Sequence, residues 1–239
     1  MKPDHGHSPT EIAERLATPP GASHLRDFVY GGIDGTVTTF AIVAGVAGAG
    51  LPHGVIVALG LANVLADGFS MAAGNYSGTM AEKENVARLR AAERRHIAEY
   101  PEGEREEVRQ ILAAKGLAGD VLEGAVASIT RNEATWIDLM MKEEHGLSSI
   151  DPHPLPAALA TFGAFLLCGI VPLAPFLFGV DAPFLWASGA TAAVFFAIGA
   201  VRSRWSLRPW WRSGSETLAI GGTAATIAYG VGHLVESWI

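Results

Sequence analysis

The sequence predicts an all-α membrane protein with five transmembrane helices and a cytoplasmic three-helix insert between the second and the third. Five apolar segments are each long enough to cross the ~30 Å hydrocarbon core, which takes about 20 helical residues. Charged residues gather instead in the middle of the chain, whereas an ordinary soluble domain spreads them over all its surface segments. This segregation indicates bilayer-spanning segments on both sides of a water-exposed domain.

The ends of the apolar segments are marked by polar or turn-forming residues. Two connections, at residues 51–53 and 179–182, are so short that each must be a tight hairpin between antiparallel spans. The predicted spans cover residues 28–50, 54–80, 155–180, 183–201 and 217–238. The predicted domains are a tail (1–24), helices 1 and 2 (25–80), the insert (81–154) and helices 3 to 5 (155–239).

The basic residues predict the orientation of these spans. All 17 Lys and Arg residues lie in the tail up to Arg26, in the insert, or in residues 202–214. Five spans place these three segments on one side of the membrane, and the positive-inside rule makes that side cytoplasmic. The first 24 residues are polar and lack the apolar core of a signal peptide, so they predict a disordered cytosolic tail.

The insert has the start and stop signals of helices. No Gly or Pro occurs between Gly78 and Tyr100, so the second span is expected to continue into the insert as one long helix. Pro101 suits the first position of a new helix, which Gly116 can end. Thr130 and Glu133 have the spacing of a capping box for a further helix over residues 132–145. The apolar side of that helix would hold Trp136, Leu139 and Met140.

Several classes of function are excluded by composition and motifs. The formal net charge is −7, and no basic patch stands apart from the acids, which argues against nucleic acid as a partner. The only cysteine, Cys168, allows neither a disulfide framework nor a thiolate metal site. We find no phosphate-binding loop, nucleophile elbow or catalytic triad. The sequence therefore predicts neither an enzyme nor an organic cofactor.

Asp34 is the first residue that indicates function. It lies within the first span beside Gly31, Gly32 and Gly35. A carboxylate at membrane depth costs several kcal/mol unless it faces protein, water or a cation. The alternative is that Asp34 lies near the cytosolic end of its span and is merely solvated or caps the helix.

The second span carries a polar stripe. Asn63, Asp67 and Met71 follow one another at four-residue spacing, which aligns an amide, a carboxylate and a thioether on one helix face. The thioether favours a transition metal such as Fe²⁺ over Mg²⁺ or Ca²⁺. The alternative is helix packing, because small residues also recur at this spacing. Those small residues are Ala66, Ser70, Gly74 and Gly78.

Three pairs of candidate metal ligands occur at helical spacing in the insert. Residues three or four apart project from one helix face, and Glu-x-x-His combined with carboxylates from other helices is how four-helix di-iron proteins bind metal. The alternative is a solvated acidic surface neutralised by nearby arginines. The pairs are Glu93 with His96, Glu104 with Glu107, and Met140 with Glu144.

Three sequence runs together resemble the vacuolar iron transporter family over about residues 24–239. They are residues 24–35 (HLRDFVYGGIDG), 70–77 (SMAAGNYS) and 136–141 (WIDLMM). The resemblance implies a homodimer with five spans per protomer. It also implies export of cytosolic Fe²⁺, and often Mn²⁺, coupled to proton movement, along a path at the dimer interface lined by the first two spans.

The resemblance also implies roles for individual residues. Asp34 and Met71 match the transport residues of the first and second spans, and Asp27 matches the acid at the base of the first. The matching metal-binding positions of the insert are Glu93, His96, Glu104, Glu107, Met140 and Glu144.

The chain departs from the family pattern at four positions. Asn63 stands where the family usually has Glu, whereas Asp67, one turn further on, is an acid where the family usually has a small residue. Asn75 replaces a second acid, and His96 stands where Glu is common. These changes bear on metal preference and on the number of protons moved.

The resulting hypothesis is a proton-coupled exporter of Fe²⁺ or Mn²⁺, whose insert captures metal from the cytosol. Its partners would be divalent metal ions, protons, a second copy of the chain and the lipid bilayer. One alternative is a membrane-anchored metal-binding or storage protein, and another is a docking protein with an acidic surface. The Ala- and Arg-rich composition favours a bacterial inner membrane over a vacuolar membrane.

Overall fold

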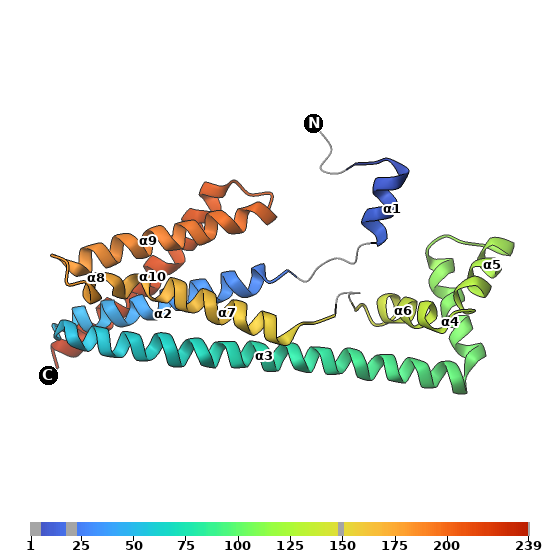
Figure 1. Cartoon of the computed structure of the whole chain (residues 1–239), viewed down its shortest axis with the longest axis horizontal. Helices are drawn as coiled ribbons and strands as arrows, with labels where there is room; N and C mark the ends of the chain where they lie inside the picture. Colours follow the sequence, from blue (N-terminus) through green and yellow to red (C-terminus); the bar gives the residue numbers. More distant parts are fainter. Residues whose placement is uncertain (1–5, 18–22, 148–150, 239) are drawn as a thin grey trace. The chain divides into compact units, whose positions relative to one another are not determined.

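The computed structural model describes residues 6–17, 23–147 and 151–238, and all regular elements within them are helices (Figure 1). Five helical segments are long and apolar enough to cross a membrane, which confirms the predicted number of spans. They are Leu25–Gly48, His53–Glu99, Pro154–Leu177, Pro183–Trp205 and Trp210–Glu236. The chain divides into two compact units, one of Ser23–Gly78 with Pro154–Ile239, the other of Met1–Ala22 with Thr79–His153.

The first unit contains four of the candidate spans and the first part of the second one, and it is built around α2 (Leu25–Gly48). This helix contacts α7 (Pro154–Gly169), α9 (Pro183–Arg202) and α10 (Trp210–Glu236). The first part of α3 (His53–Glu99) joins the same core. The buried side chains of that core are Phe40, Val43, Ala44, Val46, Ile56, Val64, Leu173, Phe176 and Ala187.

The third span is broken, although the sequence predicts it as one helix over 155–180. Helix α7 ends at Gly169 and is followed by the 3₁₀-helix η1 (Val171–Leu173) and the short helix α8 (Ala174–Leu177). Pro172 and Pro175 have no N–H to donate to the preceding turn, so a regular α-helix cannot run through them. The predicted span is therefore present at Pro154–Leu177, but its helix is interrupted near the end.

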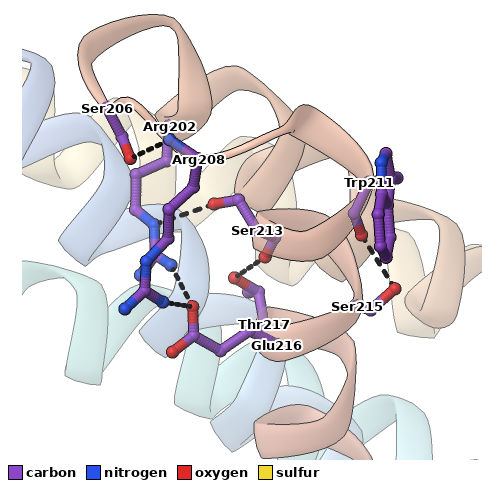
Figure 2. Close-up of polar contacts among 8 residues, drawn as sticks. All are labelled: Arg202, Ser206, Arg208, Trp211, Ser213, Ser215, Glu216 and Thr217. Atoms are coloured by element: carbon purple, nitrogen blue, oxygen red, sulfur yellow. Dashed lines mark hydrogen bonds and ion pairs between the residues drawn. The ribbon is translucent and has the colours of Figure 1, made fainter.

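The fifth helix begins at Trp210, not at residue 217, and polar side chains of its first turns bond to the arginines that precede it. The Glu216 carboxylate accepts hydrogen bonds from Arg202, at 2.9 Å, and from Arg208, at 3.1 Å (Figure 2). Arg202 also donates to the Ser213 hydroxyl at 3.2 Å. These contacts connect the end of α9 to the start of α10. Because these residues are polar, hydropathy alone assigns them to a loop and not to a span.

Two glycines allow α2 and α7 to pack backbone against backbone. A Cβ added at Gly31 would lie 2.4 Å from the Thr161 carbonyl oxygen, and one at Gly35 would lie 2.5 Å from the Phe165 carbonyl oxygen. Small residues at such seams are the usual means of close helix packing in membranes. The Gly31 and Gly35 next to Asp34 therefore have a packing role.

We expect Gly35→Ala to destabilise the protein, because the added methyl group forces α2 away from α7. Overpacking of this kind costs roughly 1–3 kcal/mol. The matched control is Gly163→Ala on α7, where the added carbon would meet nothing within 4 Å in the described residues apart from its chain neighbours and the nearby backbone of its own helix. The control should gain about 0.8–1 kcal/mol in helix propensity. Thermal unfolding of the purified protein in detergent checks this, and equal midpoints for the two variants would contradict it.

The second unit contains the end of α3 together with α4 (Pro101–Ala114), α5 (Gly119–Ile129) and α6 (Glu133–Glu143). As predicted, α3 continues without a break and α4 begins at Pro101. Gly116, just after α4, has a φ of 94°, a conformation that favours glycine. The buried core consists of Val108, Leu112, Leu122, Val126, Trp136 and Met140.

Two details of this unit differ from the sequence prediction. The helix α5 lies between Gly116 and Thr130, in a stretch for which the sequence predicts no element. The predicted capping box at Thr130 was wrong, because Asn132 caps α6 by accepting a hydrogen bond from the Thr135 N–H at 3.1 Å. An Asn side chain satisfies a free N–H of the first turn as well as Thr does.

The N-terminal segment contains a helix where the sequence predicts a disordered tail. Helix α1 spans Pro9–Ala17. The Ser8 hydroxyl accepts from the Glu11 N–H at 3.3 Å, and the Glu11 carboxylate accepts from the Ser8 N–H at 3.0 Å. This reciprocal capping is a helix-start signal that depends on the spacing of Ser8 and Glu11 and not on composition. Residues 1–5 and 18–22 of the predicted tail lie outside the described residues.

Candidate metal centre

The predicted ligands of the insert come from three helices. Glu93 and His96 lie on α3, Glu104 on α4, and Met140 on α6. Glu93 is only 2% exposed and Glu104 only 6%, although both carry ionisable carboxyl groups. Met140 is fully buried. Charged side chains are rarely buried unless they are paired or bind a cation.

One cluster is formed by Glu93, His96 and Glu104. His96 Nδ1 lies 3.6 Å from a Glu104 oxygen and 3.9 Å from a Glu93 oxygen. One ligand atom from each of the three residues lies within 4.8 Å of the others, a spacing that suits a shared metal ion. The structure thus brings together residues that are predicted on two separate helices.

A second cluster contains Glu93, Glu144 and His145, and His145 was not predicted. Its Nε2 lies 3.0 Å from a Glu93 oxygen and 3.9 Å from a Glu144 oxygen. Helical spacing identifies only residues three or four apart, and His145 directly follows Glu144. An available signal was that His145 is the last residue of the predicted helix, where the chain turns.

Two of the six predicted ligands, Glu107 and Met140, do not belong to either cluster of carboxylate and imidazole groups. Glu107 is exposed and belongs to neither cluster among the described residues, although its charge acts on Glu104. Met140 is buried one turn before Glu144 and packs in the core of the unit. Four of the six predicted ligands therefore lie in the two clusters, and these four are Glu93, His96, Glu104 and Glu144.

Two oxygen atoms in these clusters are buried without a partner. Oε2 of Glu93 and Oε2 of Glu104 are inaccessible to solvent and accept no hydrogen bond from any described residue. An unpaired carboxylate oxygen in the interior is costly, and buried polar atoms normally have a partner. A divalent cation would satisfy both oxygens. The clustered donor set of carboxylate and imidazole groups suits a first-row transition metal.

Burial also affects how these carboxyl groups titrate. The pKa of Glu104 is raised to about 7, first because burial disfavours the charged form and then because of the nearby charges of Glu107 and Glu93. The pKa of Glu144 is raised by burial and by the charge of Glu93. A bound cation would oppose both effects, because it favours the carboxylate.

We expect metal affinity to rise with pH between about 5.5 and 7.5. Below its raised pKa of about 7, Glu104 holds a proton that the metal must displace. One displaced proton makes the apparent affinity fall about tenfold for each pH unit below the pKa. Competition titrations with a chelator, at a series of pH values, measure this slope. In Glu104→Gln the slope should decrease by one proton, and an unchanged slope would contradict the assignment.

In the membrane unit, two acids from different helices act on each other. Asp34 on α2 is half-buried and interacts electrostatically with Asp67 on α3. Nearby, Asn63 Nδ2 donates to the Thr38 hydroxyl at 3.3 Å, and that hydroxyl donates to the Asp34 carbonyl at 2.9 Å. The structure therefore brings the acid of the second span close enough for its charge to act on the acid of the first.

Asp27 and Met71 line a cavity of about 310 Å³ near the start of α2. Asp27 lies 3.2 Å from His24 Nδ1 and accepts a hydrogen bond from Asn75 Nδ2 at 3.0 Å. Asn75 also donates to the Thr161 hydroxyl at 2.7 Å. This amide thus connects α2, α3 and α7. A carboxylate at position 75 could not donate these hydrogen bonds, because it has no N–H.

Comparison with known proteins identifies the family. A model of the VIT family matches residues 25–233. Vacuolar iron transporter 1 of Tulipa gesneriana is 31% identical over 241 residues, covering 96% of this chain and 96% of that relative. The vacuolar iron transporter of Toxoplasma gondii is 33% identical over 231 residues, covering 92% and 76%. Vacuolar iron transporter 1 of Eucalyptus grandis is 30% identical, covering 98% of each chain. The chain is therefore a multi-pass membrane protein that belongs to the VIT family, whose members are transporters and not enzymes.

Proposed function

We propose that this protein exports Fe²⁺ or Mn²⁺ from the cytosol in exchange for protons. The observation that carries the proposal is the interacting pair Asp34 and Asp67, because acids in two candidate spans need a function in the membrane. The relatives named vacuolar iron transporters support iron as a substrate.

The insert, residues 81–154, would capture metal from the cytosol through Glu93, His96, Glu104, Glu107, Met140 and Glu144. The metal would then pass to Asp34, Asp67 and Met71, with Asp27 and Asn63 beside the path. Carboxylates that bind metal must first lose their protons, so protons that return through the same groups would drive metal release. As the resemblance implies, a homodimer would form the path between its two copies.

The proposed orientation places the N-terminus and the insert in the cytosol, since all 17 Lys and Arg residues lie on that side. Residues 25–80 and 155–239 would form the spans, and residues 1–24 a cytosolic tail. The relatives are named for the vacuole, whereas the composition of this chain favours a bacterial inner membrane. Localisation of a tagged chain in its own cells would distinguish the two membranes.

Transport into liposomes tests the proposal. Purified protein in vesicles with an acidic interior should take up Fe²⁺ under anaerobic conditions, and dissipating the pH gradient should stop the uptake. Uptake that does not depend on the gradient would reject proton coupling. Metal binding without any uptake would favour the alternative of a membrane-anchored storage protein, which needs the insert but neither Asp34 nor Asp67.

A further inference from the structure

We infer that His145 is a metal ligand of the insert, and that its imidazole, together with that of His96, makes the centre prefer Fe²⁺ and later divalent metals over Mn²⁺. The inference rests on the proposed function, because the same centre would capture the transported metal. It adds one ligand and a metal preference to the centre predicted from the sequence.

The first argument is the position of the imidazole. His145 Nε2 is 3.0 Å from Oε1 of Glu93, whose side chain is 2% exposed, and His145 itself is 22% exposed. The same nitrogen is 3.9 Å from Glu144. The three residues can offer one ligand atom each within 4.8 Å of one another. Glu93 belongs to both clusters, so the two histidines approach a common carboxylate.

A simple ion pair between His145 and Glu93 would leave part of the cluster unexplained. The other Glu93 oxygen, Oε2, is buried and accepts no hydrogen bond from the described residues, and the same holds for Oε2 of Glu104. A structural ion pair in a protein interior normally satisfies both oxygens of its carboxylate. A cation that binds these oxygens and a neutral imidazole nitrogen satisfies them all.

The backbone explains why His145 reaches the cluster although it follows directly after Glu144. Helix α6 ends at Glu143, and Gly146, with a φ of 64°, turns the chain. The N–H of His145 donates to the Met140 carbonyl at 3.3 Å, and that of Leu147 donates to the Met141 carbonyl at 3.0 Å. This turn holds His145 against the end of the helix, so consecutive residues can both point to the cluster.

The metal preference follows from the donor atoms. Imidazole nitrogen suits Fe²⁺, Co²⁺ and Zn²⁺, whereas Mn²⁺ is bound well by oxygen ligands alone and stands lowest in the Irving–Williams order. Two imidazoles therefore strengthen binding of the later metals more than binding of Mn²⁺. Removal of one imidazole should therefore reduce the difference between the affinity for the later metals and the affinity for Mn²⁺.

The test compares Co²⁺ and Mn²⁺ binding to the full-length protein in detergent, by chelator competition. In His145→Gln we expect Co²⁺ affinity to fall at least about tenfold, since even mutation of residues that only support a ligand costs 10–100-fold. The Mn²⁺ affinity should fall less. The matched control is His153→Gln, an exposed histidine outside both clusters among the described residues. It should bind both metals as the wild type does.

X-ray absorption of the Co²⁺-loaded protein gives a second readout that does not depend on affinity. The wild type should show two imidazole ligands and His145→Gln one. Two imidazoles in the variant, or unchanged affinities for both metals, would overturn the assignment of His145 while leaving the proposed transport intact. Failure of the wild type to bind any metal would reject both this inference and metal capture by the insert.

Discussion

Replacing Asp34 by asparagine is expected to abolish Fe²⁺ uptake into liposomes, with a loss of at least ~100-fold, equivalent to ~2.7 kcal/mol. The amide has nearly the same size as the carboxylate, so packing beside Gly31 and Gly35 is kept. It removes both the negative charge that attracts the metal and the group that exchanges a proton. Asp67 alone would then remain of the interacting pair.

Two controls separate this effect from misfolding. Asp34→Asn should still bind metal at the insert, because none of the clustered ligands lies in α2. Asp181→Asn removes an exposed acid from the connection before α9 and should transport like the wild type. Full activity of Asp34→Asn would reject the proposed mechanism.

Replacing Glu93 by glutamine is expected to have the largest effect on metal binding. Glu93 is the one residue common to both clusters, so its loss weakens each of them. Removal of a single ligand should lower Fe²⁺ affinity by at least ~100-fold, more than the usual cost of removing a supporting residue. Anaerobic calorimetry of the full-length protein measures this loss. Glu99→Gln, at an exposed position on the same helix, is the matched control.

Unfolding of the metal-free protein shows whether Glu93 serves binding or stability. Its buried Oε2 has no hydrogen-bond partner among the described residues, so a neutral amide should cost little there. We expect Glu93→Gln to unfold at the same temperature as the wild type or at a higher one. Added metal should raise the midpoint of the wild type only. A large loss of stability without metal would indicate a structural role instead.

The number of spans follows from the sequence alone, and so do the starts of α3, α4 and α9 to within one residue. Hydropathy and the distribution of charge reflect the transfer of side chains between lipid and water, which does not depend on the fold. Pro101 and Gly116 act on the backbone of their own turn, so the limits of α4 could be predicted. Ligand pairs such as Glu93 and His96 could be found because residues of one helix face share a fixed spacing.

The tertiary structure decided how these local features meet. The first turns of α10 form where Arg202 and Arg208 pair with Glu216, and these contacts come from residues up to 14 positions apart. Helical spacing could not show that Glu107 lies outside the two clusters or that His145 lies in one of them, because this depends on which helix lies opposite and on the turn at Gly146. The interaction between the charges of Asp34 and Asp67 likewise depends on how α2 and α3 pack. Sequence spacing fixes side chains within one helix, whereas a site shared by several helices is set by how they pack.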